Sequence, residues 1–458
     1  MNPSWASIID VSYIFIFILV GKLIKEKLGI FRSIIVPTSL LAGFIGLLFS
    51  DQVFNLISYS RDIYSAIVYH CLGIGFIALT LAEKEDVQRK DSINSGLFII
   101  STYCFQGLVG MVIVFGMIVT IKPDMFPGLG LILPLAFGQG PGFASNIGRT
   151  WDTTLGIGFA NQYGLTLATV GFLVGGILGI IVLNIVVRKQ KINVEKLNTL
   201  SGLQYKELKV SAVKEINFYD MLTTQIVWII VIYYLALNSM YLISSGLKSL
   251  GDIGLTISGL IDGFNYMFGI LIAILFKKLL KGLKKRGHRT KVLTDSYLMH
   301  NIASLSFHIM ITASVMAISL SVIKDYWELL LAISFGGAIA TLIFVVFFGK
   351  IAFNHHPWYY ILAMFGMMTG TASTGLALLR GLDPELETDV ASNLVLGSAV
   401  AAPLGLPLMI MLSLPAISYV NGTRTYYYVA FWGILAYLLL MMSLLTIRSI
   451  KERKRMEN

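Results

Sequence analysis

Long apolar stretches recur along almost the whole chain and constrain its fold more than any other feature. A helix needs about 20 apolar residues to cross the hydrocarbon core of a bilayer. The stretches lie near residues 5–21, 34–49, 60–82, 94–121, 128–150, 158–187, 218–245, 254–276, 296–321, 328–349, 358–379, 388–418 and 425–447. This pattern predicts an all-α polytopic membrane protein whose main solvent is the lipid bilayer, with the first stretch retained as a span.

Composition excludes a water-soluble globular domain. Hydrophobic residues make up 56% of the chain and charged residues only 13%, with a mean hydropathy of +0.77. The net charge of +10 comes from short basic runs between apolar stretches, unlike a nucleic-acid-binding surface. The two cysteines and six histidines show no metal-binding spacing, and no nucleophile–base pair is evident. We therefore expect no enzymatic activity, no cofactor, no transition-metal site and no nucleic-acid partner.

Lys and Arg residues predict how the spans are oriented. Most of the 35 fall in a few connections and in the tail, at 22–32, 83–91, 188–214, 277–291 and 448–458. The positive-inside rule places these segments in the cytoplasm. They share that side only if 128–150 and 358–379 each enter and leave the membrane on one face. We therefore predict two re-entrant hairpins, an external amino terminus and a cytoplasmic carboxyl terminus, in the cell (inner) membrane.

The same sorting divides the chain into two inverted repeats of about five transmembrane helices plus one re-entrant hairpin each. Weak internal similarity at an offset of about 230 residues supports the repeat. In particular, Phe137-Gly138 and Gly140 match Phe365-Gly366 and Gly370. The expected units are the first repeat 1–187, a basic cytoplasmic linker 188–217, the second repeat 218–418, an additional span 425–447 and a basic cytoplasmic tail 448–458.

The first predicted hairpin contains a glycine-rich break. Gly138, Gly140, Pro141 and Gly142 interrupt a helix near its middle and leave backbone groups without helical partners. The amino terminus of a half-helix attracts a carboxylate, and broken carbonyl ends suit Na⁺. The alternative is a glycine-rich helix that packs tightly against a neighbour. The expected substrate-binding residues here are Gln139, Gly140, Ser145, Asn146 and Arg149.

The second predicted hairpin gathers four hydroxyl groups in an apolar stretch, from Thr369, Thr371, Ser373 and Thr374. We expect this cluster to line the same substrate site. The alternative for any one hydroxyl is a bond to its own backbone four residues earlier. Arg380 follows and is a candidate for a bidentate bond to a substrate carboxylate, unless it only extends to the lipid interface.

Three further residues are candidates for binding the coupling ion, Na⁺. Asn161 and Asn393 open the spans that follow the two hairpins, where a side-chain carbonyl suits either a cation shell or a helix cap. Asp262 lies inside an apolar stretch, and a carboxylate within the membrane is a functional candidate by default. The alternative is a polar role near the membrane surface, because Asp262 lies close to the expected start of its span.

Three segments resemble the bacterial sodium/glutamate symporter family. The segment from Leu131 to Gly179 includes Phe-Gly-Gln-Gly-Pro-Gly-Phe-Ala-Ser-Asn and is similar to the family's first glycine-rich hairpin and the adjoining span. Gly370 to Arg380 resembles the second hairpin, and Tyr326-Trp-Glu-Leu resembles a segment that precedes a span. The similarity extends diffusely over about 1–418, but only these segments are specific.

The resemblance implies Na⁺-coupled symport of glutamate or a related acidic amino acid, by alternating access, in a homodimer. This chain has Gln139 where familiar members carry histidine, and it adds the span 425–447. The first difference leaves open a carrier of another small carboxylate, a dicarboxylate or hydroxyacid, including a proton-coupled one. A passive channel or membrane-anchored scaffold would explain the hydrophobicity but not paired broken segments of opposite polarity.

Overall fold

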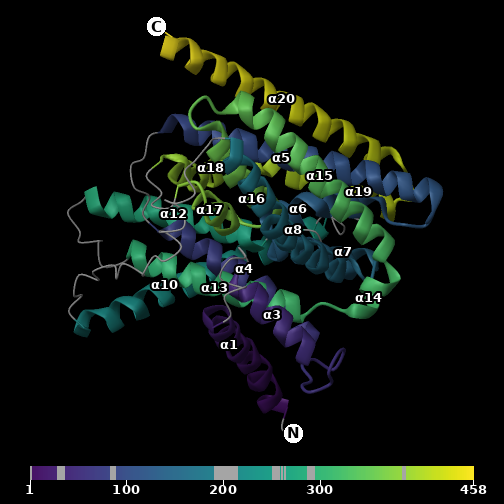
Figure 1. The fold of residues 1–458 in the computed structure, drawn as a ribbon. Helices are drawn as coiled ribbons and strands as arrows, with labels where there is room; N and C mark the ends of the chain where they lie inside the picture. Colours follow the sequence, from purple (N-terminus) through teal and green to yellow (C-terminus); the bar gives the residue numbers. More distant parts are fainter. Residues whose placement is uncertain are drawn as a thin grey trace.

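The chain folds as a bundle of helices (Figure 1). The computed structural model describes residues 3–27, 37–82, 89–189, 215–249, 258, 261, 265–285, 294–383 and 388–457. Within these residues the only β-type pairing is an isolated bridge between Ser50 and Ile57. The predicted all-α polytopic membrane fold is confirmed.

Eight of the described helices are long and apolar enough to cross a membrane. They are α1 (Pro3–Lys27), α4 (Arg61–Leu81), α5 (Arg89–Thr120), α8 (Ala160–Lys189), α10 (Glu215–Lys248), α13 (Ser296–Met316), α15 (Trp327–Ala352) and α20 (Thr425–Glu457). A ninth candidate is the pair α18 (Val390–Leu404) and α19 (Leu406–Val420), which bends by 50°.

One predicted span is shorter than expected, and another is described only in part. The stretch 34–49 contains α3 (Thr38–Phe49), which has 12 residues. The stretch 254–276 contains the start of α12 (Asn265–Lys285), whose second half is rich in lysine. Most of residues 250–264 lie outside the described part of the chain, as do 190–214, which make up most of the predicted linker. The predicted tail continues α20 as a helix to Glu457.

Each predicted hairpin consists of two short helices separated by a break. In the first, a 3₁₀ turn (η1, Pro127–Leu131) leads into α6 (Ile132–Gln139), and α7 (Pro141–Leu155) follows. Gly140 between them has φ 81°, which favours glycine. In the second, α16 (Pro357–Thr369) and α17 (Ala372–Leu379) flank Gly370 and Thr371. Proline at the first position of α7 and α16 suits a helix start, where the missing N–H has no helical acceptor.

Equivalent helices of the two halves run in opposite directions. Helices α4 and α13 are equivalent, because the next long helix after each, α5 or α15, leads into a hairpin. The start of α4 lies at the end of α13, where the Tyr59 hydroxyl donates to the Met316 carbonyl. Likewise the end of α5 meets the start of α15, with Lys122 Nζ 3.5 Å from Glu328 Oε2. Two copies of a unit whose matching helices are antiparallel are inverted relative to each other, as the sequence predicts.

Helix packing repeats under exchange of the halves. Helix α1 packs on α3 as α10 packs on α12, and α3 packs on α13 as α12 packs on α4. Helix α5 contacts α18 as α15 contacts α8. Helix α20 lies outside this scheme and packs along α5, α15 and α19 (Figure 1).

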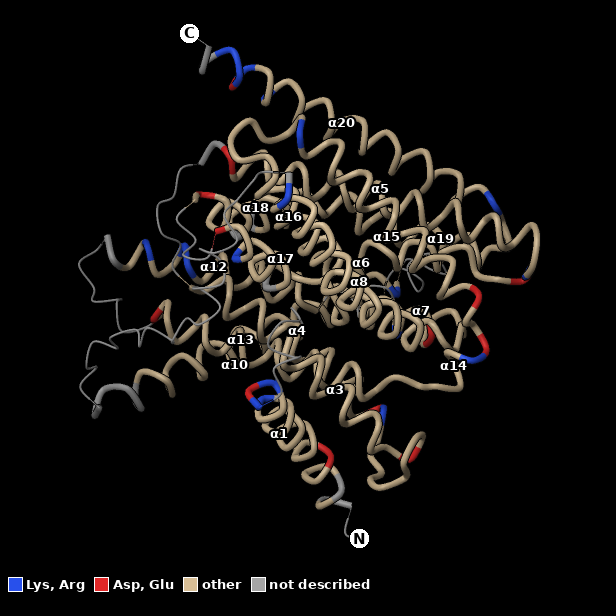
Figure 2. The backbone as a smooth tube through the Cα atoms, in the orientation of Figure 1, with Lys and Arg blue, Asp and Glu red and all other residues tan. Residues whose placement is uncertain are grey.

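Charged residues lie mainly at the ends of helices and in connections, and the middle of the bundle is almost free of them (Figure 2). This distribution is typical of a chain whose middle layer lies in hydrocarbon. Which side faces the cytoplasm stays a prediction from the Lys and Arg pattern.

Candidate functional site

The two helix breaks meet inside the bundle. A Cβ atom built on Gly140 would lie 3.6 Å from Cγ2 of Thr371. The ring of Phe172, on α8, lies beside both breaks, 4.0 Å from a Cβ on Gly140 and 3.2 Å from one on Gly370. Residues 230 positions apart in the sequence, Gly140 and Gly370, therefore border one place.

Helix α5 supplies a hydrogen-bond donor to each broken helix. The Tyr103 hydroxyl donates to the Gly138 carbonyl at 2.9 Å, and Gln106 Nε2 donates to the Met368 carbonyl at 2.8 Å. Each carbonyl lies two residues before its break, where the ended helix has no further N–H to offer. Residues three apart on a helix share a face. One face of α5 thus stabilises both breaks.

Glycines on α8 let the second hairpin approach closely. A Cβ on Gly171 would lie 2.8 Å from the Thr369 carbonyl oxygen, and one on Gly175 would lie 2.9 Å from the Thr369 hydroxyl oxygen. Small residues at such positions allow membrane helices to pack backbone to backbone. Helix α8 therefore forms one wall of the meeting point.

Two buried oxygen atoms around the second hairpin have no hydrogen-bond partner among the described residues. They are the Thr374 hydroxyl oxygen and Gln106 Oε1, both on residues that are 1% exposed. The Thr369 hydroxyl, in contrast, donates to the carbonyl of Phe365 at 2.7 Å. Since buried polar atoms are nearly always paired, the two unpaired oxygens are candidates for contacting a ligand. Gln139 and Thr371, at the breaks, are partly buried.

Ser145 and Asn146 lie in α7, about 7.5 Å and 9 Å along the helix beyond Gly140. The Ser145 hydroxyl donates to Asn161 Oδ1 at 2.7 Å, so the structure brings together one predicted substrate-binding residue and one predicted ion-binding residue. Asn146 Nδ2 donates to Asn265 Oδ1 at 3.0 Å. Both side chains tie the second half-helix to its neighbours.

Asn146 belongs to a longer chain of hydrogen-bonded polar groups. Asn265, at the start of α12, donates to the Tyr233 hydroxyl at 3.2 Å and to the Tyr69 carbonyl at 3.1 Å. The Tyr233 hydroxyl lies 2.7 Å from His70 Nδ1. This chain connects the first hairpin to α4, α10 and α12.

The remaining predicted residues do not reach the meeting point in this conformation. Asn393 bonds to the Tyr360 hydroxyl and accepts from Ser92, and Tyr360 lies about 15 Å of helix before Gly370. Arg149 and Arg380 are exposed, and the Arg149 guanidinium lies 5.9 Å from the centre of the Tyr69 ring. Asp262 and the side chain of Ser373 lie outside the part of the chain that the structure describes.

Four residues of the site were not predicted from the sequence, namely Tyr103, Gln106, Tyr233 and Asn265. Gln106 offered a signal, since it is a lone amide in the middle of a long apolar stretch. Tyr103 offered none, because a tyrosine in such a stretch is an ordinary packing residue.

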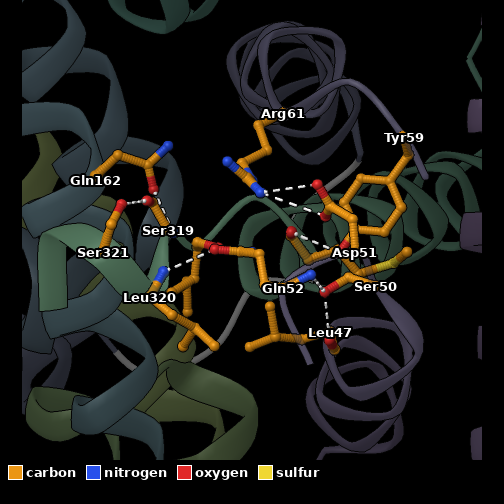
Figure 3. A network of polar contacts seen from close by, with 12 residues as sticks. Leu47, Ser50, Asp51, Gln52, Tyr59, Arg61, Gln162, Ser319, Leu320 and Ser321 are labelled. Atoms are coloured by element: carbon orange, nitrogen blue, oxygen red, sulfur yellow. Dashed lines mark hydrogen bonds and ion pairs between the residues drawn. The ribbon is translucent and has the colours of Figure 1, made fainter. Parts of the chain in front are cut away.

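A second polar network links the α3–α4 connection, α8 and the link between α13 and α14 (Leu320–Asp325) (Figure 3). The backbone N–H groups of Ser319 and Leu320 donate to Gln162 Oε1 at 3.0 Å and Gln52 Oε1 at 2.8 Å. Gln52 Nε2 also donates to the Ile318 carbonyl at 2.9 Å. Two glutamines thus satisfy backbone groups that leave the helical pattern after α13.

Tyr59 completes this network from the α3–α4 connection (Figure 3). Burial raises the pKa of its hydroxyl to about 12, so the group stays protonated at physiological pH. It can therefore always donate to the Met316 carbonyl, the last of α13.

No protein family, curated protein or solved structure matches the chain. The described residues also contain no group of three or more His, Cys, Asp or Glu side chains placed to hold a metal ion.

Proposed function

We propose that the protein is a secondary active transporter that couples the uptake of glutamate, or a related acidic amino acid, to Na⁺ by alternating access. One observation carries the proposal, namely the contact between two broken helices of opposite repeats at Gly140 and Thr371, against α8. Breaks in membrane helices are stable only where protein or a water-filled cavity surrounds them, and in transporters they form ion and substrate sites.

The polarity of the four half-helices suits an anion together with a cation. Helices α7 and α17 begin at the meeting point, with Pro141 and Ala372, so their amino-terminal N–H groups favour a carboxylate. Helices α6 and α16 end there, at Gln139 and Thr369, and carbonyl ends suit a hard cation. A substrate carboxylate and Na⁺ bound together would each lower the cost of burying the other.

We assign the two unpaired oxygens, Thr374 Oγ1 and Gln106 Oε1, to the Na⁺ shell or to the substrate amine. In this proposal Gln139 and Thr371, which border the meeting point, contact the substrate. None of these residues is basic, so half-helix amino termini and Na⁺ supply the positive charge. The proposal includes a homodimer in the cell membrane, as the family resemblance implies.

The test is uptake of radiolabelled glutamate into proteoliposomes, with and without an inward Na⁺ gradient. Accumulation above the external concentration only with the gradient would support the proposal and exclude a passive channel. No glutamate uptake by folded, oriented protein would exclude this substrate. Dicarboxylates and hydroxyacids would then be tested in Na⁺-free buffer across a pH gradient, where uptake would indicate the proton-coupled alternative.

A further inference from the structure

Helix α20 has no counterpart in the first repeat, yet it is built closely into the fold. Its buried face is a stripe at helical spacing against α5 and α19, formed by Tyr427, Ala430, Ile434, Leu438, Met441 and Leu445. The opposite face exposes large apolar side chains such as Trp432 and Leu439. This is the pattern of a membrane helix with one protein face and one lipid face.

The span beside α20 is the one that bends. Helices α18 and α19 meet at Gly405 at an angle of 50°, and prolines lie on both sides, at 403 and 407. Pro407 has no N–H to donate to the Pro403 carbonyl, and its ring displaces that turn. The equivalent span of the first repeat, α8, is one helix of 30 residues. The bend and the extra helix are two features that distinguish the second repeat from the first.

A direct hydrogen bond connects these two features. The Tyr437 hydroxyl, on α20, donates to the Leu404 carbonyl at 2.6 Å, one residue before the bend. In hydrocarbon, backbone groups released by a bend must find a partner within the protein. Tyr437 provides one at the place where the helix pattern is interrupted.

The end of α20 is anchored by polar contacts, which makes the helix a firm support. Arg448 Nε donates to Asn94 Oδ1 at 3.0 Å, and Asn94 Nδ2 donates to Glu452 Oε2 at 2.8 Å. The Ser449 hydroxyl donates to the Ile351 carbonyl at 2.6 Å. Helix α20 is thereby fixed to the start of α5 and the end of α15.

The bent span continues this connection toward the hairpins. Helix α18 packs tightly on α5, because a Cβ on Gly397 would lie 2.4 Å from Ser95 Cβ and one on Gly96 2.6 Å from Val400. Two turns further along, α5 carries Tyr103 and Gln106, which hold the two breaks.

We propose that α20 is a brace for the bent span, and that Tyr437 is a positioning residue that holds the bend and, through α18 and α5, the two hairpin breaks. The extra helix is present because the second repeat has a bent span where the first has a straight one. This role does not depend on what the protein transports.

The experiment is hydrogen–deuterium exchange of the protein in lipid nanodiscs, comparing wild type with Tyr437→Phe. Loss of one hydroxyl should speed exchange of the backbone N–H groups within residues 405–409, of which Pro407 has none, about tenfold, and exchange around 138–140 and 368–371 by a smaller factor. The matched control is Tyr427→Phe, on the same buried stripe, whose hydroxyl makes no hydrogen bond within the described residues. It should leave all three regions unchanged.

Unchanged exchange at 405–409 in Tyr437→Phe would overturn the brace. Faster exchange there, with no change at either hairpin, would overturn the positioning role alone. A second variant, Asn354→Ala with Ser449→Ala, loosens α20 at its far end and should also speed exchange at 405–409. None of these measurements uses transport, so a failed uptake assay would count against the proposed function and not against the brace.

Discussion

Single hydroxyl groups have opposite energetic roles within this bundle, and two tyrosines make the contrast measurable. The Tyr103 hydroxyl is buried and bonded to the Gly138 carbonyl, whereas the Tyr163 hydroxyl is buried with no partner among the described residues. Removing one partner of a buried hydrogen bond costs the desolvation of the group left behind, but removing an unpaired group does not.

We therefore predict that Tyr103→Phe lowers the free energy of unfolding in mixed micelles by about 1–3 kcal/mol. Tyr163→Phe should be neutral or stabilising, because no bond is lost and a buried polar group is removed. Equal destabilisation by both variants would show that the Tyr103 bond contributes nothing beyond packing.

The threonines of the second hairpin provide a similar pair for function. Thr374→Val removes the unpaired hydroxyl at constant volume, and Thr369→Val removes one that is bonded to its own helix. If Thr374 contacts Na⁺ or substrate, we expect Na⁺-driven uptake to fall at least tenfold in Thr374→Val, which corresponds to about 1.4 kcal/mol. Uptake in Thr369→Val should stay within about twofold of wild type. Normal uptake in both variants would remove Thr374 from the site.

At the residue scale, the sequence predicted the two helix breaks but not the side chains that donate hydrogen bonds to them. Gly140 and Pro141 indicate a break, because few other residues end one helix and start the next within two positions. Donors such as Tyr103 lie 35 residues away in the chain, and only the packing of α5 against α6 brings the hydroxyl to the carbonyl. Asn393 follows the second hairpin in the sequence, but its side chain bonds to Tyr360 and does not reach the break.

At the scale of helices, α7 and α8 are joined by a reciprocal small-residue contact. Ala144 and Gly148 on α7 face Gly164 and Ala160 on α8, each pair spaced four apart. A Cβ on Gly148 would lie 2.4 Å from the Ala160 carbonyl, and one on Gly164 would lie 2.7 Å from the Ala144 carbonyl. This is backbone contact, which a larger residue cannot enter without separating the helices.

Gly148→Ala should therefore destabilise the protein by about 1–3 kcal/mol. The control is Gly116→Ala on α5, where a Cβ would have nothing within 4 Å. This control should be neutral or stabilise the helix by up to about 1 kcal/mol, because alanine favours helices over glycine. Unfolding in mixed micelles measures both, and an unaffected Gly148→Ala would mean that α7 and α8 separate easily.

At the scale of the whole molecule, the Lys and Arg pattern and the helix contacts agree on which helix ends lie on the same side of the membrane. The start of α5 contacts the end of α20, through Asn94 and Arg448, and the end of α5 contacts the start of α15. The first pair is predicted to be cytoplasmic and the second external.

Single cysteines can test this orientation after Cys71 and Cys104 are replaced. A membrane-impermeant thiol reagent applied to intact cells should label Lys122→Cys and Asp325→Cys, and should label Lys454→Cys only after the membrane is opened. The reverse pattern would place the carboxyl terminus outside and overturn the topology while leaving the fold intact.

The overall architecture was accessible from sequence because hydrophobic length and charge placement act along the chain. The pairings of α5 with α18 and of α8 with α15 were not, since they depend on contacts between distant segments. The sequence also did not predict that α20 continues to Glu457. The contacts of this segment to Asn94 and Asn354, which come from distant parts of the chain, cannot be seen in a run of basic residues.

The bend at Gly405 makes the two repeats unequal, which matters for the transport cycle that we propose. A carrier made of two identical inverted units would rest equally often with its binding site open to either side, because exchanging the units converts one state into the other. This chain breaks that equivalence with one bent span, one straight span and a hydroxyl that serves only one of them. If the protein works as the proposed carrier, its two resting states differ in free energy, and the bent span with its Tyr437 hydrogen bond contributes to that difference.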